Sequence, residues 1–434
     1  MNVLLLGNGG RENAIAWKIK QSKLLTKLYV APGNAGTSNI AENINLNLNN
    51  FKEISDIIIQ KNIDLLIIGS ETPLVNGIFD FLKSKKEHKN LLLIGPDKNG
   101  ATLEGSKDFA KKFMQKYKIP TAKYFTVTKE NVDDGIKFLQ KLKAPFVLKA
   151  DGLAAGKGVL IIRNSEEAII ELQNILSGKF GNAGEKVVIE EFLDGIECSV
   201  FVLTDGKNFI LLPEAKDYKR IGEGNTGLNT GGMGAISPVP FFNEEFKEKT
   251  INQIIIPTIT GIAEENFDYC GFVFFGLMNV NNNPFVIEYN VRLGDPETEA
   301  IMPRIKSDFL QLLIDTANKK TGENEILISA ENCATVMLVS RGYPENYETG
   351  KTVFGLDEIK ESIIFHAGTK IENSEWQNHR QSQVITSGGR VLSVSSVGQD
   401  MKEAVQKSYN SIKKIKFEKM YCRNDIGFEF IKKQ

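Results

Sequence analysis

Short apolar runs alternate with amphipathic segments over the first hundred residues of the chain. Four runs have the length and continuous hydrophobicity of strands that are buried on both faces: Leu4–Leu6, Leu28–Val30, Leu65–Ile68 and Leu91–Ile94. Each is followed by loop-forming residues, in the segments GNGG, APGNAG, GSETP and GPDKNG. Parallel strands need crossover helices between them, so this alternation predicts an open α/β sheet whose ligands bind at the strand tips.

Beyond this region the hydrophobic pattern changes twice. A lysine-rich helix starting near Lys107 is expected first, followed by longer strands and glycine loops up to about Gly322. From about Cys333 the chain again contains strand-like runs and a final helix: Ala334–Val339, Gln383–Thr386, Arg390–Val394 and Met401–Ile415. The sequence therefore predicts an α/β and α+β multidomain protein with domains at residues 1–104, 105–325 and 326–434.

Composition limits the function only weakly. The 434 residues are 41% hydrophobic and 25% charged, and the net charge of −1 gives no general positive field for nucleic acid. The longest apolar stretch, near Gly271–Val280, is too short to cross a bilayer. The four cysteines lack the CxxC spacing of a metal site. We expect a cytoplasmic protein that binds neither nucleic acid nor membrane.

The loop GNGGRE after the first strand raises the question of a dinucleotide site. Such a site needs G-x-G-x-x-G and an acidic residue about 20 positions later that binds the ribose. The third glycine position holds Glu12, and the second strand ends in Ala31–Gly33 without an acid. We therefore expect no NAD or FAD. The loop can still hold one phosphate at a helix N-terminus beside Arg11, or it can be a purely structural turn.

The strongest local signal is PFVLKADGLAAGKGVLII, from Pro145 to Ile162. Two apolar strands flank a glycine loop that contains Lys149 and Lys157, and no hydroxyl residue follows Lys157 as a Walker A loop would require. The N–H groups and lysine charges of such a hairpin can cover a triphosphate. A surface hairpin is the alternative, and it does not account for the two lysines. The acidic strand end VVIEEFLDGIE is a weaker signal for adenine and ribose.

The segment PFVIEYNVRLGDPE carries candidate metal ligands. Glu288 and Asn290 alternate with apolar neighbours, so they lie on one face of a strand, and their oxygens suit Mg2+. Arg292 has the same parity and can bind an anion that the metal leaves partly unneutralised. Three polar groups on a half-buried face would be costly without partners, which favours a functional site. The preceding strand, Gly276–Val280, offers no second carboxylate.

Together these motifs resemble the ATP-grasp superfamily and, within it, the glycinamide ribonucleotide synthetase family. The resemblance covers nearly the whole chain and rests on GNGGRE, PGNAG, LEGSK, KADGLAAGKGV, EEFLDG, NTGGMGA, RLGDPE, HAGT and SGGRVL. It implies the ATP-dependent ligation of glycine to 5-phosphoribosylamine through glycyl phosphate, in de novo purine biosynthesis. It also implies a Rossmann-like N-terminal domain, a central ATP-grasp domain with a mobile lid near residues 121–190, and a small mixed α/β C-terminal domain.

The resemblance further implies roles for individual residues. ATP is expected to contact Lys107, Lys149, Gly152, Gly156, Lys157, Gly158, Glu190, Glu191, Leu193 and Glu197. The two other substrates are expected to contact Gly9, Gly10, Arg11, Asn34, Asp217, Gly231, Gly232, Arg292, Asp295 and Arg390. Among these, Lys149, Asp217 and Arg292 are expected to act in the chemistry. Glu288 and Asn290 correspond to the ligands of Mg2+ or Mn2+, and a monomer or weak dimer is expected.

The chain departs from the family pattern at several positions. The usual GREHA has Asn13, TGPNTGG has Leu228, RFGDPE has Leu293, and Glu299 replaces a usual Gln. The usual QDHKR becomes AKDYKR, in which Lys216 and Tyr218 flank Asp217 and so bear on substrate contacts there.

Two other functions remain open at this stage. One is a sister ATP-grasp enzyme that acts on another purine intermediate or on bicarbonate, although NTGGMGA and the HAGT/SGGRVL pair favour the glycine ligase. The other is a regulator that binds nucleotide without catalysis. A regulator is expected to have lost lysines or metal ligands, and the chain retains Lys107, Lys149, Lys157, Glu288 and Asn290.

Overall fold

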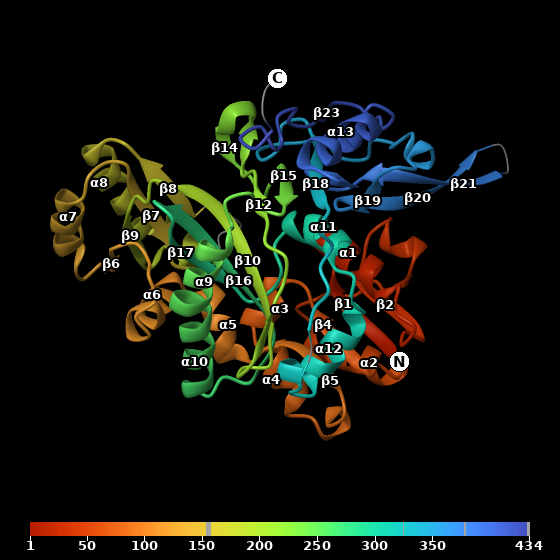
Figure 1. Ribbon diagram of the computed structural model, residues 1–434, viewed down its shortest axis with the longest axis horizontal. Coiled ribbons are helices and arrows are strands. Elements are labelled where there is room, and N and C mark those ends of the chain that lie inside the picture. The colour runs from red at the N-terminus through yellow and green to blue at the C-terminus, as the bar shows by residue number, and fades with distance from the viewer. Residues whose placement is uncertain (153–157, 324, 377–378, 432–434) are drawn as a thin grey trace.

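A computed structural model describes the chain except residues 153–157, 324, 377–378 and 432–434. The N-terminal part is a wound α/β layer whose parallel strands follow the order β5-β4-β1-β2-β3 (Figure 1). Its strands are β1 (Asn2–Gly7), β2 (Lys27–Pro32), β3 (Glu42–Asn43), β4 (Leu65–Ile68) and β5 (Leu92–Pro96). Its helices are α1 (Gly10–Ile19), α2 (Phe51–Gln60), α3 (Glu71–Val75), α4 (Ile78–Lys83) and α5 (Lys98–Gly105). The four predicted strands and their parallel pairing are confirmed.

A separate small sheet follows helix α6 (Lys107–Lys116). Its antiparallel strands have the order β6-β9-β7-β8: β6 (Tyr124–Val127), β7 (Phe146–Ala150), β8 (Val159–Ile162) and β9 (Val187–Glu191). Helices α7 (Val132–Lys141) and α8 (Ser165–Asn174) pack on it and share its own hydrophobic core. The two strands predicted to flank the glycine loop are confirmed as the β7–β8 pair, in which Phe146 lies opposite Ile162.

The N-terminal layer continues into the central part of the chain as one nine-stranded sheet, in the order β11-β10-β16-β5-β4-β1-β2-β3 with β17 paired to β16. The added strands are β10 (Ile196–Thr204), β11 (Phe209–Leu211), β16 (Tyr269–Val280) and β17 (Asn283–Asn290). The junction is the short antiparallel pairing of β16 with β5, where Gly271 has no Cβ that would press on the Gly95 backbone. The nearby helices are α9 (Glu244–Thr250), α10 (Ile256–Glu264), α11 (Glu297–Ile301) and α12 (Phe309–Ala317).

The C-terminal sheet takes in two strands from the central part of the sequence, in the order β12-β15-β18-β22-β19 with β23 paired to β18. Its strands are β12 (Lys216–Asp217), β15 (Gly234–Ser237), β18 (Asn332–Ser340), β19 (Ile363–His366), β22 (Arg390–Gly398) and β23 (Met420–Tyr421). Helix α13 (Met401–Ile412) packs against it. Two hairpins complete the fold: β13 (Arg220–Gly222) with β14 (Thr226–Asn229), and β20 (Thr369–Trp376) with β21 (His379–Thr386). Asp217 therefore lies where the central and C-terminal parts meet.

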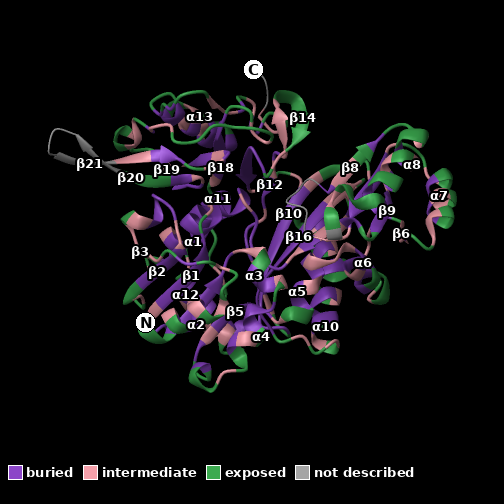
Figure 2. Ribbon diagram, turned by 180° about the vertical axis from the view of Figure 1, so that it is seen from behind, coloured by how far each residue is buried: buried purple, intermediate pink, exposed green. Residues whose placement is uncertain are grey.

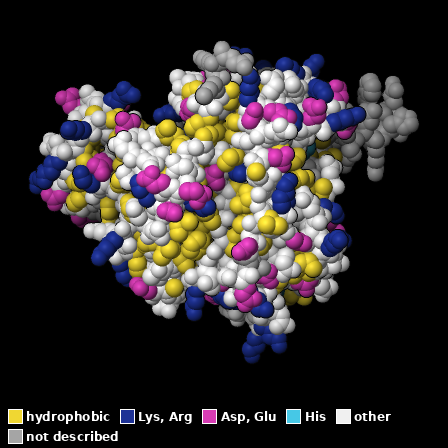
Figure 3. Space-filling model, in the orientation of Figure 1, with side chains coloured by type: hydrophobic (Ala, Val, Ile, Leu, Met, Phe, Trp, Pro, Cys, Tyr) yellow, Lys and Arg dark blue, Asp and Glu magenta, His cyan; other side chains and the backbone are white. Residues whose placement is uncertain are grey.

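The core follows the alternation of side chains along the central strands, which are largely buried away from their ends (Figure 2). Leu4 and Leu6 pack on one face of β1, whereas Val3 and Leu5 pack on the other. On the face seen in Figure 3, basic and acidic side chains are interspersed, in keeping with the net charge of −1. Within the described part of the chain, no helix is long and apolar enough to cross a membrane.

Candidate active site

The glycine turn before α1 is filled by the side chain of Glu12. The Gly9 N–H donates to Glu12 Oε2 (2.7 Å), and Glu12 Oε1 accepts from Arg11 Nε (2.6 Å). A Cβ atom at Gly7, where φ is +139°, or at Gly69 would overlap the Glu12 side chain. The Glu12 carboxylate therefore occupies the inner side of the turn, which a dinucleotide fold leaves open for pyrophosphate. Arg11, expected to be available to a phosphate, is instead buried and paired with Glu12.

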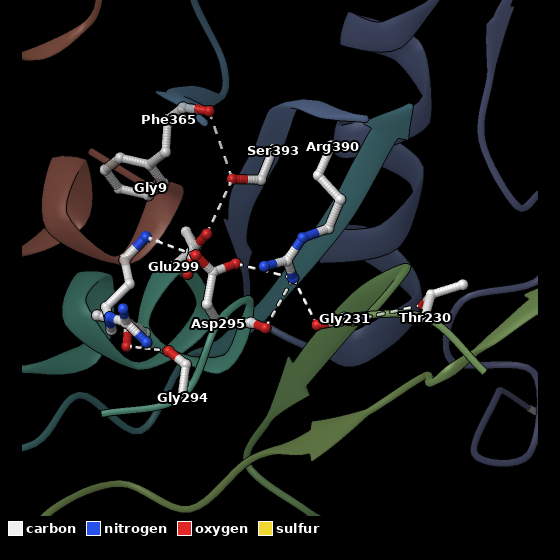
Figure 4. Close-up of polar contacts among 12 residues, drawn as sticks. Gly9, Thr230, Gly231, Gly294, Asp295, Glu299, Phe365, Arg390 and Ser393 are labelled. Atoms are coloured by element: carbon white, nitrogen blue, oxygen red, sulfur yellow. Dashed lines mark hydrogen bonds and ion pairs between the residues drawn. The ribbon is translucent and has the colours of Figure 1, made fainter. Parts of the chain in front are cut away.

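Several of the predicted substrate residues meet around Arg390, where three distant segments converge (Figure 4). Arg390 NH1 donates to the carbonyl oxygens of Gly231 (2.5 Å) and Asp295 (2.8 Å), and it lies 3.0 Å from Asp295 Oδ1. Asp295 Oδ2 accepts from the Arg11 N–H (3.2 Å), which connects this group to the start of α1. Gly10 lies against Glu299, because a Cβ there would overlap Glu299 Oε1. The structure thus places the first glycine turn and Gly231 beside the ion pair of Asp295 and Arg390.

Asn34 has a different environment from the one expected of a substrate ligand. Its Nδ2 donates to the carbonyl oxygens of Asn8 (2.9 Å) and His366 (2.7 Å), and its Oδ1 accepts from the N–H groups of Gly36 and Thr37. Its amide donors and acceptor are therefore engaged within the protein. The side chain ties the first loop to the C-terminal sheet, and any substrate contact there depends on a rearrangement of these bonds.

Asp217 and Glu297 form a pair of carboxylates near the loop that contains Gly231 and Gly232. Asp217 Oδ1 is buried without a hydrogen-bond partner among the described residues, whereas Glu297 Oε1 accepts from Ser199 Oγ (2.8 Å). Burial and the neighbouring Glu297 raise the pKa of Asp217 well above its usual range, and burial raises the pKa of Glu297. Gly232, with φ of +114°, brings the backbone so close that a Cβ would overlap Pro296. Lys219 offsets part of this negative charge, and a bound cationic amine would add a further counter-charge.

Cations from four parts of the chain surround Glu288. Partial burial alone would raise its pKa, but Lys219, Lys149 and Lys107 together with Arg292 hold the pKa below its usual value. Lys149 Nζ donates to the Ile287 carbonyl (3.1 Å), and Lys107 Nζ donates to the Gly152 carbonyl (3.1 Å). Glu288 is therefore an ionised carboxylate beside several ammonium groups, an arrangement suited to a polyphosphate with its metal ion.

Lys219 was not among the residues predicted from the sequence. It pairs with Glu197 and lies 3.9 Å from Glu288 Oε1, so it joins the expected ribose ligand to the expected metal ligand. Glu197, Lys219 and Glu288 come from β10, the β12–β13 connection and β17. These three residues are close together only in the folded chain. The residues next to Lys219 in the sequence form no pattern that indicates a role for it in the site.

A buried Lys–Glu–Lys group lies next to these cations. Glu190 on β9 is 2.9 Å from Lys149 Nζ on β7 and 3.1 Å from Lys111 Nζ on α6. Lys111 also donates to Thr121 Oγ1 (2.7 Å), and burial lowers its pKa to about 8 against the opposing effect of Glu190. Glu190 and Lys149 were predicted to contact ATP, whereas Lys111 was not singled out within the predicted lysine-rich helix.

The remaining residues expected at ATP have varied surroundings. Glu191 Oε1 accepts from the Lys123 N–H (2.9 Å), and Leu193 lies half-buried in the connection between β9 and β10. Gly158 is buried at the start of β8. Two further predicted residues, Gly156 and Lys157, lie outside the described residues.

Arg292 lies just beyond the strand on which parity placed it, because β17 ends at Asn290. Its NH2 still reaches back to Asn290 Oδ1 (3.3 Å), and the same atom lies 2.7 Å from Glu104 Oε1. Glu104 comes from the LEGSK motif, and it also accepts from the Val291 N–H (2.8 Å). Arg292 is thus held beside the candidate metal ligands by a buried carboxylate that sequence analysis did not assign.

Glu288 and Asn290 fit a divalent cation that is shared with a nucleotide. Both project from β17, and the residue opposite Glu288 on β16 is Gly276, so this position of the neighbouring strand adds no ligand. Among the residues that the structure describes, no three His, Cys, Asp or Glu side chains are grouped as a complete metal site. Magnesium commonly takes one or two protein oxygens, with phosphate oxygens and water at its other positions.

Comparison with known proteins decides the family. Residues 1–104, 105–298 and 333–429 match the N domain, the ATP-grasp (A) domain and the C domain of phosphoribosylglycinamide synthetase. The chain is 44% identical over 430 residues to the phosphoribosylamine–glycine ligase of Clostridium acetobutylicum, covering 98% of this chain and 99% of that protein. It is 41% identical over 440 residues to that of Escherichia coli K12, covering 100% of both. The chain belongs to the phosphoribosylglycinamide synthetase family.

Solved structures support the same assignment. The crystal structure of phosphoribosylamine–glycine ligase from Thermotoga maritima matches with a TM-score of 0.84 and 34% identity, covering 98% of this chain and 100% of that one. A biotin carboxylase from Campylobacter jejuni shares the fold, with a TM-score of 0.68 at 15% identity over 96% of this chain and 92% of that one. The predicted multidomain architecture of the synthetase family is confirmed.

The departure from the synthetase family's QDHKR pattern leaves Asp217 facing the site. Successive side chains of a strand point to opposite faces, so Lys216 and Tyr218 project away from the face of Asp217. Both contact Glu429 near the C-terminus: Lys216 Nζ lies 3.3 Å from its Oε1, and the Tyr218 hydroxyl donates to its Oε2 (2.9 Å). The two substituted residues are therefore accommodated by the C-terminal segment.

Proposed function

We propose that this protein is the ATP-dependent ligase that joins glycine to 5-phosphoribosylamine, forming glycinamide ribonucleotide, ADP and phosphate in de novo purine biosynthesis. The observation that carries the proposal is the division of charge in the site. Ammonium and guanidinium groups surround Glu288 on one side. On the other side, the carboxylates of Asp217 and Glu297 lie near the backbone of Gly232. This arrangement occurs in a chain whose residues 1–298 and 333–429 match the domains of the synthetase family.

The nucleotide is assigned to the cationic side. Lys107, Lys149 and the loop that begins at Gly152 would hold the phosphates, and the β9–β10 connection with Leu193 would meet the adenine. Glu197 would bind the ribose once Lys219 turns toward the phosphates. A divalent cation, which we take to be Mg2+ or Mn2+, would be held by Glu288 and Asn290 and would offset charge on the transferring phosphoryl group.

Glycine is assigned to the carboxylate side. Its amino group is a protonated ammonium at neutral pH, so it is the cation that Asp217 and Glu297 would bind. Gly231 and Gly232 let the backbone approach the small substrate, and the glycine carboxylate would then point toward Arg292. Phosphoribosylamine would lie toward Gly9, Gly10, Asp295 and Arg390, near the tips of the N-terminal strands.

The reaction proceeds in two steps. An oxygen of the glycine carboxylate attacks the γ-phosphorus, and the bond from that phosphorus to the β,γ-bridging oxygen breaks to release ADP. The nitrogen of phosphoribosylamine then attacks the acyl carbon of glycyl phosphate, phosphate leaves with the bonding electron pair, and the nitrogen loses a proton. Lys149 and Arg292 would stabilise the charge on the phosphoryl group during the first step.

The small sheet β6–β9 would act as the mobile lid, close to the expected range of residues 121–190. It has its own hydrophobic core, and it carries Lys149 and Glu190 on strands that face the larger sheet across α6. Closure over the nucleotide would exclude water from glycyl phosphate. We infer a cytoplasmic enzyme, because the substrates are small metabolites. We keep the expectation of a monomer or weak dimer.

Release of ADP tests the function. The purified protein is incubated with ATP, Mg2+, glycine and freshly prepared phosphoribosylamine, and each is omitted in turn. We expect sustained ADP release and formation of glycinamide ribonucleotide only in the complete mixture. Sustained release that is unaffected by omitting glycine would contradict the proposal, and release that requires bicarbonate or another amine would favour a sister ATP-grasp enzyme.

A further inference from the structure

The C-terminal segment Tyr421–Glu429 wraps around the stretch that carries Asp217, residues 216–229. The Tyr421 hydroxyl donates to the Ile221 carbonyl (3.0 Å), and Arg423 NH1 donates to the Arg220 carbonyl (3.1 Å). In the reverse direction, the Gly224 N–H donates to Asp425 Oδ2 (2.7 Å). Strands β12, β14 and β23 lie at the same end of the molecule (Figure 1). The two segments are therefore bound together at several points although about 200 residues separate them in the chain.

Glu429 makes the contacts closest to Asp217. Its two carboxylate oxygens bind the residues on either side, Lys216 at 3.3 Å and Tyr218 at 2.9 Å. Lys216 is only 5% exposed, and its Nζ also lies over the Tyr218 ring at 4.4 Å from the centroid. A buried ammonium without a counter-charge is unfavourable, so Glu429 is the group that allows Lys216 to occupy this position.

The carboxylate of Asp217 has little support of its own. Its Oδ1 has no hydrogen-bond partner within the described part of the chain. The backbone on which it stands is aligned by the pairing of Asp217 with Ala235 in β15 and by the two neighbours that Glu429 binds. A shift of β12 would therefore move the Asp217 carboxylate relative to Gly232 and Glu297.

We propose that Glu429 is a positioning residue for the binding of glycine, acting through Lys216 and Tyr218 on the orientation of Asp217. This proposal rests on the proposed function, in which Asp217 binds the glycine ammonium group. It assigns to the C-terminal segment the support of Lys216 and Tyr218, two departures from the family pattern.

The test compares Glu429→Gln with the double variant Lys216→Gln/Glu429→Gln. The single variant leaves the Lys216 ammonium unpaired, and we expect the KM for glycine to rise about tenfold. The dissociation constant for ATP with Mg2+, measured by calorimetry, should stay at the wild-type value. The double variant removes the unpaired charge as well, so it should restore the KM for glycine to within about twofold of wild type.

Glu418→Gln is the matched control. Glu418 also lies in the C-terminal part and forms an ion pair with Lys351 (3.0 Å), but among the described residues it makes no hydrogen bond or ion pair with residues 216–229. We expect it to leave the KM for glycine unchanged. An unchanged KM in Glu429→Gln would overturn the positioning role, as would an equal loss of ATP affinity without rescue in the double variant. Failure of the wild-type protein to consume glycine would instead overturn the proposed function.

Discussion

At the scale of single residues, the protonation of each carboxylate follows from its neighbours. Glu288 remains ionised because three lysines and an arginine lie around it. Glu299 has the opposite environment: burial and the nearby Asp295 raise its pKa well above the usual range, and its Oε2 has no hydrogen-bond partner among the described residues. A protonated Glu299 has one donor and one acceptor, so it can replace the family's usual Gln without adding a charge.

Glu288→Gln tests the assignment of the metal ligand. The change removes a negative charge without altering the shape of the side chain, so the fold should be retained. We expect kcat to fall on the order of a hundredfold or more, because the loss affects charge stabilisation in phosphoryl transfer. Steady-state ADP release at saturating Mg2+ is the measurement, with circular dichroism to check the fold. Native-like turnover would show that Glu288 is not a ligand.

Glu299→Gln tests the protonation of this buried carboxyl. In the folded protein Glu299 keeps its proton at pH values where the unfolded chain has lost it, so the stability of the wild type falls as pH rises from about 4 toward the raised folded pKa. The amide does not titrate. The variant should therefore unfold at a higher temperature than wild type at pH 7 and at the same temperature near pH 4. Calorimetric melting at both pH values measures this, and a variant less stable than wild type at pH 7 would contradict it.

At the scale of elements, Lys111 and Glu190 join the small sheet to the rest of the molecule. Lys111 belongs to α6, Glu190 and Lys149 belong to the small sheet, and Lys149 donates to the Ile287 carbonyl of β17. Thr121, at the entry to the small sheet, accepts from Lys111 and donates to the Val286 carbonyl (2.6 Å). These contacts fix the direction from which Lys149 reaches the nucleotide.

Lys111→Met tests this connection. We expect the dissociation constant for ATP to rise about tenfold, because Glu190 and Lys149 lose the contact with Lys111 that aligns them. The KM for glycine should stay the same, because within the described structure the residues assigned to glycine make no hydrogen bond or ion pair with Lys111. In the wild type, ATP affinity should also fall as pH rises through about 8, where Lys111 loses its charge, and this dependence should be absent in the variant. Calorimetric titrations at several pH values measure both effects.

The control for that variant is the neighbouring Lys112→Met. Lys112 is largely exposed and pairs with Asp108 at 2.8 Å, so its loss should change ATP affinity by less than about twofold. Equal effects of the two substitutions would show that α6 acts through its general charge and not through the contact with Glu190.

The sequence pattern predicted the elements and the parallel pairing of the N-terminal strands, but not the contacts between distant parts of the chain. The glycine loop with Lys149 and the alternation of Glu288 with Asn290 were readable because hairpins and strands leave a local periodicity. Three site residues were not predicted: Glu104, Lys219 and Glu297. Each contributes to the site through a partner that is distant in the sequence, as when Glu104 accepts a hydrogen bond from the Val291 N–H. The same reason explains why the joining of β16 to β5 was not predicted.

At the scale of the whole molecule, one nine-stranded sheet runs from the N-terminal layer into the central part of the chain, whereas β6–β9 form a sheet of their own. The first glycine turn follows β1, and β1, β10 and β17 all belong to the large sheet. The large sheet therefore fixes the positions of these parts of the site relative to one another. The small sheet has a separate core, and we propose that it moves as a unit.

Hydrogen exchange tests this division. Addition of ATP with Mg2+ should slow exchange in the small sheet, residues 124–191, because closure over the nucleotide protects its backbone. Exchange in β1 and β4 should change little. Mass spectrometry of peptides from both regions is the measurement. Uniform protection of the whole chain, or protection confined to the N-terminal strands, would contradict the assignment of the small sheet as the lid.

The central claim is that the glycine carboxylate is activated by phosphoryl transfer before the amine attacks. Glycine labelled with 18O in both carboxylate oxygens distinguishes this route directly, because the attacking oxygen leaves with the phosphorus when the amide forms. During turnover with ATP, Mg2+ and phosphoribosylamine, mass spectrometry should find one labelled oxygen in each phosphate released and one in each glycinamide ribonucleotide. Phosphate that carries no label while the product accumulates normally would contradict the account.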